Sequence, residues 1–197
     1  MSSRVDELSA CVVIGRNEGE RLVHCLKSLI KQVQIQWIVY VDSGSTDESV
    51  ANAKRLGVDV VALDMSIPFT AARARNAGYA RLKARHLPCD FVQFIDGDCE
   101  LIEGWIESAR TALESAADVA VVFGGQSERF PEATFWNKLI SHEWEGQAGV
   151  TDACGGNAMI RGEALDQVGG YRDDLIAGEE PDQAPHHGSW HCHHMHL

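Results

Sequence analysis

Short apolar runs alternate with segments of helical periodicity along the chain as far as Phe123. The apolar runs predict strands at residues 11–14, 37–41, 58–63, 91–95 and 119–123. Between them, apolar side chains recur at helical spacing and predict helices at residues 22–30, 45–56, 71–83 and 104–115. The second helix is expected to begin at Ser45, because Ser45 and Glu48 have the spacing of a capping box.

This alternation predicts the fold class. Strands that alternate with helices over short connections form right-handed βαβ units. We therefore expect an α/β fold, Rossmann-like, with a mostly parallel sheet flanked by helices. No internal repeat or long linker interrupts the chain before Asp182, so one domain is expected over residues 1–182.

Polar residues follow several predicted strands at the point where each strand ends. Asn17 and Glu18 follow the first strand, Asp42 ends the second, and the triplet Asp96–Asp98 ends the fourth. Parallel strands end at the same edge of a sheet, and ligands bind beyond that edge. We therefore expect these side chains to line one cleft, although Asn17 and Glu18 taken singly fit an exposed polar turn equally well.

Asp96 and Asp98 are the candidates for metal chemistry. Their carboxylates are one residue apart, and Gly97 permits a turn that lets both face one cleft. Carboxylate oxygens suit Mg²⁺ or Mn²⁺, which often share their coordination with substrate phosphates. Acidic turns are common, so the triplet indicates a metal site chiefly because an apolar strand precedes it. A Mn²⁺ or Mg²⁺ cofactor is the prediction.

Two further side-chain types suit a nucleotide. The Asp42 carboxylate can accept hydrogen bonds from the N–H groups of a base such as uracil. Arg73 and Arg75 lie near the start of the predicted helix 71–83, where guanidinium groups and the helix dipole favour a diphosphate. One of the two arginines is expected to lie on a solvated helix face instead.

The composition excludes several partners. The formal net charge of -12 over 197 residues disfavours nucleic acid, because like charges repel. No apolar run is long enough to cross a bilayer, so any association with a membrane would not use a transmembrane segment. The N-terminus lacks a signal-peptide core, and the scattered cysteines form no C-x-x-C pair, which together indicate a reduced, cytoplasmic protein.

The composition changes after Asp182. Residues 183–197 contain six of the nine histidines and show no apolar periodicity. We expect this His-rich tail to be irregular. A metal site built from its histidines is disfavoured, because ordered ligands need a scaffold that the segment does not show.

Five segments together resemble the family 2 glycosyltransferases of the GT-A type. They are VVIGRNEGERLVHCLKSL, IVYVDSGSTDESV, PFTAARARNAG, FVQFIDGDCEL and CGGNAMIRGEALDQVGGYRDDLIAGEEPD, and their order and spacing agree with the family over about residues 10–182. The resemblance implies a GT-A fold and a nucleoside-diphosphate sugar, UDP- or GDP-linked, as donor. It also implies that Arg75, rather than Arg73, matches the A-R-N segment of the family.

The resemblance assigns roles to the residues at the strand ends. Asp42 would hold the nucleotide base, Asp96 would contact the ribose, and Asp98 would bind the metal ion. Asn17 and Glu18 would line the nucleotide site.

Further along, the resemblance implies an acceptor side. Gly156 and Asn157 fall in the stretch that lines the donor sugar and the acceptor. Glu180 matches the general base of the acidic acceptor motif, with Glu179 as the alternate. The family continues from this motif into an amphipathic helix that the His-rich tail replaces here, so we expect a truncation, a frameshift or a divergent terminus.

The function predicted from these features is the inverting transfer of a sugar to a hydroxyl of a glycan, lipid or small-molecule acceptor. One alternative is a catalytically inactive remnant that binds nucleotide-sugar. The other is a nucleotidyltransferase, which has less support because no G-x-x-x-x-G-K-[ST] loop occurs.

Overall fold

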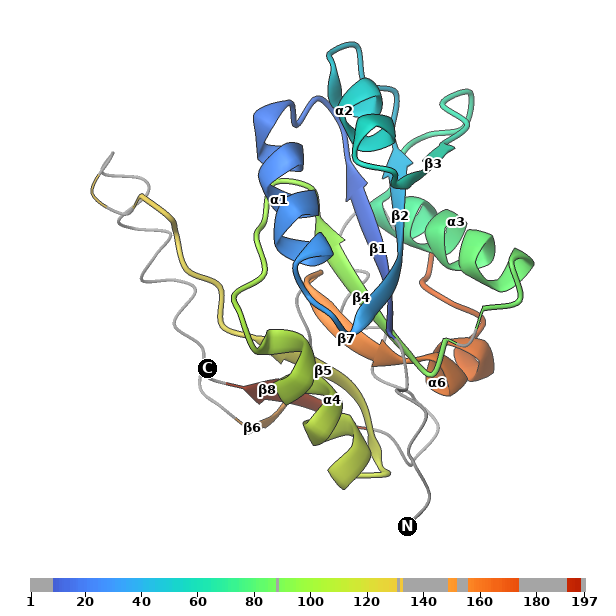
Figure 1. Cartoon of the computed structure of the whole chain (residues 1–197). Helices are drawn as coiled ribbons and strands as arrows, with labels where there is room; N and C mark the ends of the chain where they lie inside the picture. Colours follow the sequence, from blue (N-terminus) through green and yellow to red (C-terminus); the bar gives the residue numbers. More distant parts are fainter. Residues whose placement is uncertain are drawn as a thin grey trace.

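The computed structural model describes residues 9–87, 89–130, 132, 149–151, 156–173 and 191–195. Within them one eight-stranded sheet runs in the order β3-β2-β1-β4-β7-β5-β8-β6, with helices on both faces (Figure 1). The strands are β1 (Ser9–Gly15), β2 (Ile35–Asp42), β3 (Asp59–Ala62), β4 (Phe91–Asp96), β5 (Val119–Gly124), β6 (Gly149–Thr151), β7 (Ala158–Arg161) and β8 (His191–Met195). The helices are α1 (Glu20–Ile30), α2 (Ser49–Arg55), α3 (Ala71–Ala84), α4 (Trp105–Ser115) and α6 (Gly162–Val168).

The sheet has a parallel half and a mixed half. Strand β1 pairs in parallel with β2 and β4, and β3 pairs in parallel with β2, which confirms the predicted βαβ arrangement. Beyond β4, the antiparallel strand β7 separates β4 from β5. The sequence did not predict β7, because its four residues are too few to show a period. The outcome is an α/β sheet whose carboxyl ends at β1, β2 and β4 lie together.

Side chains of alternate strand residues face opposite helical layers. Val12 and Ile14 of β1 belong to the core that α3 and α6 cover, whereas Cys11 and Val13 belong to the core under α1 and α2. A third cluster packs α4 on β4, β5 and β7. Both faces of β1 are therefore buried, as a central parallel strand requires.

Helix α3 approaches β1 closely through Gly78. A Cβ atom at this position would lie 2.3 Å from Cγ1 of Val12. Because glycine has no side chain, the backbone of α3 can pack directly against β1. This contact positions the helix that carries Arg73 and Arg75 in its first turns.

The predicted capping box at Ser45 is wrong. Helix α2 begins at Ser49, and Glu48, which precedes it, makes no side-chain capping hydrogen bond. The Ser45 hydroxyl oxygen instead accepts a hydrogen bond from the backbone N–H of Asn17, at 2.9 Å. Ser45 therefore connects the loops after β1 and β2, and the Asp47 carboxylate accepts from the Ser49 N–H at the helix start.

The expectation of an irregular tail is wrong for residues 191–195. They form β8, which pairs in parallel with β5 and antiparallel with β6. The edge of β5 offers backbone N–H and C=O groups that a partner strand satisfies whatever its side chains are, so apolar periodicity is not required. The other tail residues lie outside the described part of the chain.

Candidate functional site

The Asp96-Gly97-Asp98 turn begins at the last residue of β4, which lies between β1 and β7 in the sheet. The backbone N–H of Gly97 donates to the carbonyl oxygen of Ile14 at 2.7 Å, which fastens the turn to β1. A Cβ atom at position 97 would lie 3.1 Å from that oxygen, so the close crossing depends on glycine. The Asp96 and Asp98 side chains are 40% and 46% exposed, and both carboxylates can therefore meet a ligand.

Asn157, just before β7, and Cys99 form hydrogen bonds with this turn and with each other. The Asn157 Oδ1 atom accepts a hydrogen bond from the Asp96 backbone N–H at 2.8 Å, and its Nδ2 group donates to the Cys99 sulfur at 3.3 Å. The Cys99 thiol donates in turn to Oδ1 of Asp98, at 3.5 Å. Burial, with Asp98 and Asp96 adding to it, raises the pKa of the Cys99 thiol to about 12, so the sulfur keeps its proton at neutral pH.

Arg75, on α3, contacts the Asp96 carboxylate. Its side chain is only 4% exposed, and its guanidinium lies 3.3 Å from Oδ1 of Asp96 and 5.5 Å from the centre of the Tyr171 ring. A Cβ atom at Gly156 would lie 2.2 Å from Nη2 of Arg75. Gly156 therefore makes room for the arginine, whereas the sequence suggested only that it makes room for a ligand.

Asn76 holds Tyr171 over Arg75. Its side-chain amide donates to the Tyr171 carbonyl and accepts from the Tyr171 N–H, both at 2.8 Å. Asn76 therefore binds the backbone of Tyr171, while Arg75, the preceding residue of the A-R-N segment, packs against the Tyr171 ring. Neither Asn76 nor Tyr171 was singled out from the sequence, because an amide and an aromatic ring far apart in the chain give no local signal.

Arg73 points elsewhere. Its guanidinium donates to the carbonyl oxygens of Asp64, Ile67 and Pro68, and so holds the loop that leads into α3. The structure does not bring Arg73 together with Asp96 and Asp98. One of the two arginines was expected to lie on a solvated helix face; the Arg73 guanidinium is instead bound to backbone carbonyl groups.

Asn17 connects two strand-end loops. Its backbone N–H reaches Ser45, and its Oδ1 atom accepts from the backbone N–H of Thr46 at 2.7 Å. The φ angle of Asn17 is 57°, in the left-handed region that asparagine tolerates better than most residues. The side-chain oxygen predicted to meet a nucleotide is thus already engaged in joining the loops after β1 and β2.

Asp42 lies at the end of β2, almost buried. Its side chain accepts hydrogen bonds from the backbone N–H groups of Gly44 and Ser45 through Oδ2, and from the Tyr40 hydroxyl through Oδ1, at 3.0–3.1 Å. These bonds fix the carboxylate orientation in a turn that borders the Asn17 loop. Its proposed contact with a base stays a prediction.

Glu18 and Arg21 adjoin the acidic turn on the α1 side. The Arg21 guanidinium lies 2.7 Å from the Glu18 carboxylate and 3.9 Å from that of Asp98. Burial raises the pKa of the Glu18 carboxyl; Arg21 opposes this effect, and the charges of Asp98 and Asp47 add to it. The structure therefore gathers Glu18, Asp96 and Asp98 into one region of negative charge.

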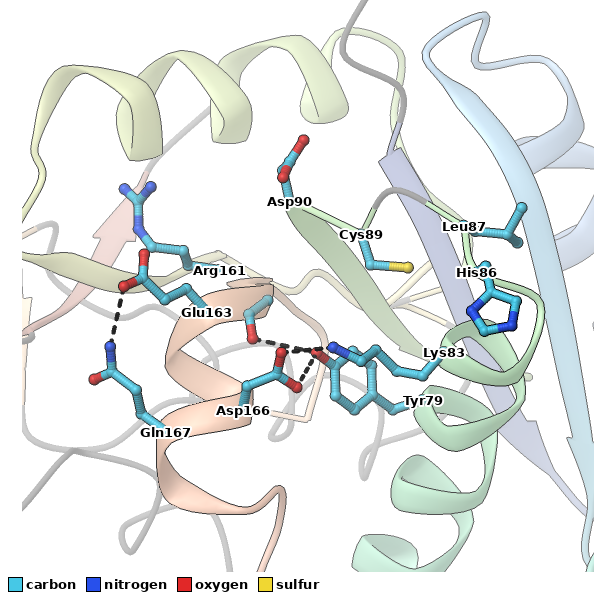
Figure 2. A pocket seen from close by; sticks show the side chains of 11 residues that line it. Tyr79, Lys83, His86, Leu87, Cys89, Asp90, Arg161, Glu163, Asp166 and Gln167 are labelled. Atoms are coloured by element: carbon cyan, nitrogen blue, oxygen red, sulfur yellow. Dashed lines mark hydrogen bonds and ion pairs between the residues drawn. The ribbon is translucent and has the colours of Figure 1, made fainter.

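A cavity lies at the other end of β4. It has a volume of about 780 Å³ and opens between α3 and α6, around Tyr79, Lys83 and Asp166 (Figure 2). Lys83 pairs with Asp166 at 2.6 Å, and the Tyr79 hydroxyl donates to the same carboxylate at 2.8 Å. Because these polar groups bind one another, and the cavity is remote from the acidic turn, we do not assign it the chemistry of the strand-end residues.

The described residues alone do not make a complete metal site at the acidic turn. No group of three or more His, Cys, Asp and Glu side chains suited to a metal ion occurs in the described residues. Asp98 supplies one exposed hard-oxygen ligand, which fits an ion that takes most of its coordination from phosphates and water. Glu179 and Glu180, the predicted base and its alternate, lie outside the described residues.

Comparison with known proteins identifies the family. The model of glycosyl transferase family 2 matches residues 10–169, a range that contains every strand-end residue considered above. The chain belongs to this family. A TPR repeat-containing protein of Synechococcus elongatus is 31% identical over 108 residues, which cover 54% of this chain and 24% of that protein.

Solved structures share the fold. TarS of S. aureus (residues 1–349) in complex with UDP has a TM-score of 0.65 at 15% identity, over 96% of this chain and 61% of that one. The mannosyltransferase PcManGT of Pyrobaculum calidifontis, in complex with GDP-Man and Mn²⁺, has a TM-score of 0.63 at 21% identity, over 88% and 50%. Glucosyl-3-phosphoglycerate synthase of Mycobacterium tuberculosis, with Mn²⁺, UDP and glucosyl-3-phosphoglycerate, has a TM-score of 0.55 at 19% identity, over 80% and 58%.

These relatives are longer than the chain. It spans 50% to 61% of the length of the three solved chains. No helix in the described residues is long and apolar enough to cross a membrane.

Proposed function

We propose that the protein transfers a sugar from a nucleoside-diphosphate sugar to a hydroxyl acceptor. The observation that carries the proposal is the Asp96-Gly97-Asp98 turn at the carboxyl end of β4. Both carboxylates are exposed, and the turn lies inside the segment that matches the family model. Among the structural relatives, PcManGT is in complex with GDP-Man and Mn²⁺, and glucosyl-3-phosphoglycerate synthase is in complex with UDP and Mn²⁺. Both complexes support a nucleoside-diphosphate sugar as the donor.

We assign different parts of the donor to different residues. Asp42, fixed by Tyr40 and its own turn, would accept hydrogen bonds from the base, and Asp96 would accept from the ribose hydroxyls. Because Arg75 is almost fully buried against Asp96, we assign it to orienting that carboxylate rather than to direct contact with the diphosphate.

Asp98 would hold the Mn²⁺ or Mg²⁺ ion. When bound, the ion supplies positive charge that stabilises the diphosphate as it leaves. The Glu18 carboxylate, which is largely buried and paired with Arg21, adds a third acidic group to this region, which favours a divalent cation.

The transfer itself is a direct displacement. The acceptor oxygen forms a bond to the anomeric carbon as the bond from that carbon to the diphosphate oxygen breaks, and the nucleoside diphosphate leaves with the electron pair. We propose that the acceptor proton passes to Glu180, with Glu179 as the alternate base. The sugar configuration would invert, because there is one displacement.

A product assay tests this function. The protein is incubated with UDP- and GDP-linked sugars, Mn²⁺ and a set of hydroxyl acceptors, and products are separated by chromatography. We expect release of nucleoside diphosphate that Glu180→Gln abolishes without changing donor affinity, because an amide keeps the shape but cannot accept the proton. Nucleoside triphosphate formed with added pyrophosphate would indicate a nucleotidyltransferase instead.

A further inference from the structure

We propose that Cys99 is a positioning residue that sets the orientation of the Asp98 carboxylate toward its metal ion. The inference rests on the proposed function, because it concerns the metal ligand of that site. Cys99 immediately follows Asp98 and is half-buried between the acidic turn and Asn157.

The direction of each hydrogen bond around the sulfur follows from its neighbours. The Asp96 backbone N–H can only donate, so the Asn157 atom that meets it must be the oxygen Oδ1. This leaves the Nδ2 group of Asn157 facing the sulfur of Cys99, which therefore accepts. The thiol proton is then free to donate, and Oδ1 of Asp98 lies 3.5 Å away to accept it.

The backbone of the turn is fixed by other bonds. The Cys99 N–H donates to the Asp96 carbonyl at 3.0 Å, and the Gly97 N–H donates to Ile14 at 2.7 Å. Neither bond involves the Cys99 side chain. Removing the thiol should therefore leave these two bonds in place, while Asp98 loses a donor and the Nδ2 group of Asn157 loses an acceptor.

The thiol holds one carboxylate oxygen and leaves the other available. Oδ2 of Asp98 lies 3.9 Å from the Arg21 guanidinium, which is beyond hydrogen-bond distance. Outer groups that orient a metal ligand typically change metal affinity by about 10- to 100-fold, and a weak thiol donor belongs near the lower end.

The test measures the affinity for Mn²⁺ in the presence of UDP by calorimetric titration. Cys99→Val fills the same space without a donor, and Cys99→Ser restores a donor. Cys89→Val, a half-buried cysteine at the other end of β4, is the matched control (Figure 2). UDP is also titrated without metal, because a general loss of folding would weaken that binding too.

The proposal predicts that Cys99→Val weakens Mn²⁺ binding about tenfold while metal-free UDP binding and the melting temperature stay close to those of the parent. Cys99→Ser should recover most of the Mn²⁺ affinity, and Cys89→Val should keep all of it. Parental Mn²⁺ affinity in Cys99→Val, or equal losses in the Val and Ser variants, would overturn the positioning role.

Asp98→Asn separates this proposal from the function on which it rests. Loss of Mn²⁺ binding in Asp98→Asn together with parental affinity in Cys99→Val overturns the positioning role alone. Parental affinity in both variants overturns the metal site itself and the positioning role with it.

Discussion

The backbone N–H of Asp96 donates to the side-chain oxygen of Asn157, 2.8 Å away and 61 residues along the chain. This bond joins the end of β4 to the start of β7, the two strands that border the acidic turn. Asn157 was expected to line the donor-sugar and acceptor side. The structure shows that Asn157 binds the backbone of Asp96, the residue proposed to contact the ribose; its role on the donor-sugar and acceptor side stays a prediction.

Asn157→Ala should lower the free energy of unfolding by about 1–3 kcal/mol, because a partly buried N–H loses its acceptor. Urea denaturation monitored by circular dichroism measures the change. Gln167→Ala, which removes an exposed amide on α6, is the control and should change stability by less than about 0.5 kcal/mol. Equal stabilities of the two variants would show that the Asn157 bond contributes nothing measurable.

Gly156→Ala should weaken UDP binding by displacing Arg75, since the added Cβ atom would lie 2.2 Å from the guanidinium. A double-mutant cycle with Arg75→Ala identifies the cause. If the clash is with Arg75, the double variant should bind UDP no more weakly than Arg75→Ala alone, because the effects of two contacting residues do not add. Fully additive losses would instead place the effect of Gly156 in direct contact with the ligand.

Glu18 should make stability fall as the pH rises toward neutrality. Burial raises the pKa of its carboxyl in the folded protein, so the folded state holds the proton more tightly than the unfolded state. Between the ordinary pKa and the raised one, unfolding releases a proton and is favoured by higher pH.

Glu18→Gln removes this dependence. Relative to the parent, the variant should gain stability as the pH rises above the ordinary pKa of about 4.3, with little difference from this cause below it. Thermal unfolding at several pH values measures the difference. A gap between the two proteins that stays constant with pH would mean that the pKa of Glu18 is unchanged on folding.

The sequence predicted the parallel half of the sheet because periodicity is a local property. Val12, Ile14, Val39 and Val41 recur at alternate positions on strands that are buried on both faces, and the polar strand ends at Asp42 and Asp96 follow directly. The order of β4, β7 and β5 could not be read in this way, because insertion of an antiparallel strand depends on contacts across the sheet.

The sequence predicted which side chains lie near the strand ends better than it predicted the partners of those side chains. Asp96 and Arg75 were expected near a nucleotide, and the structure places them 3.3 Å apart. That Gly156 accommodates Arg75, and that Asn17 is bound to Thr46, could not be inferred, because both depend on residues distant in the chain. The capping box at Ser45 failed for the same reason: a distant N–H competed for its hydroxyl.

Calorimetric titration of UDP and GDP, with and without Mn²⁺, tests the central claim most directly. Asp98→Asn is compared with Glu163→Gln, which exchanges an exposed carboxylate for an amide beside the cavity at the opposite end of β4. We predict that Mn²⁺ strengthens binding of one of the two nucleotides to the parent and to Glu163→Gln, and that Asp98→Asn loses this enhancement while remaining folded. Nucleotide binding that is absent from the parent, or that is equally enhanced by Mn²⁺ in Asp98→Asn, would contradict the assignment of the acidic turn as the metal and donor site.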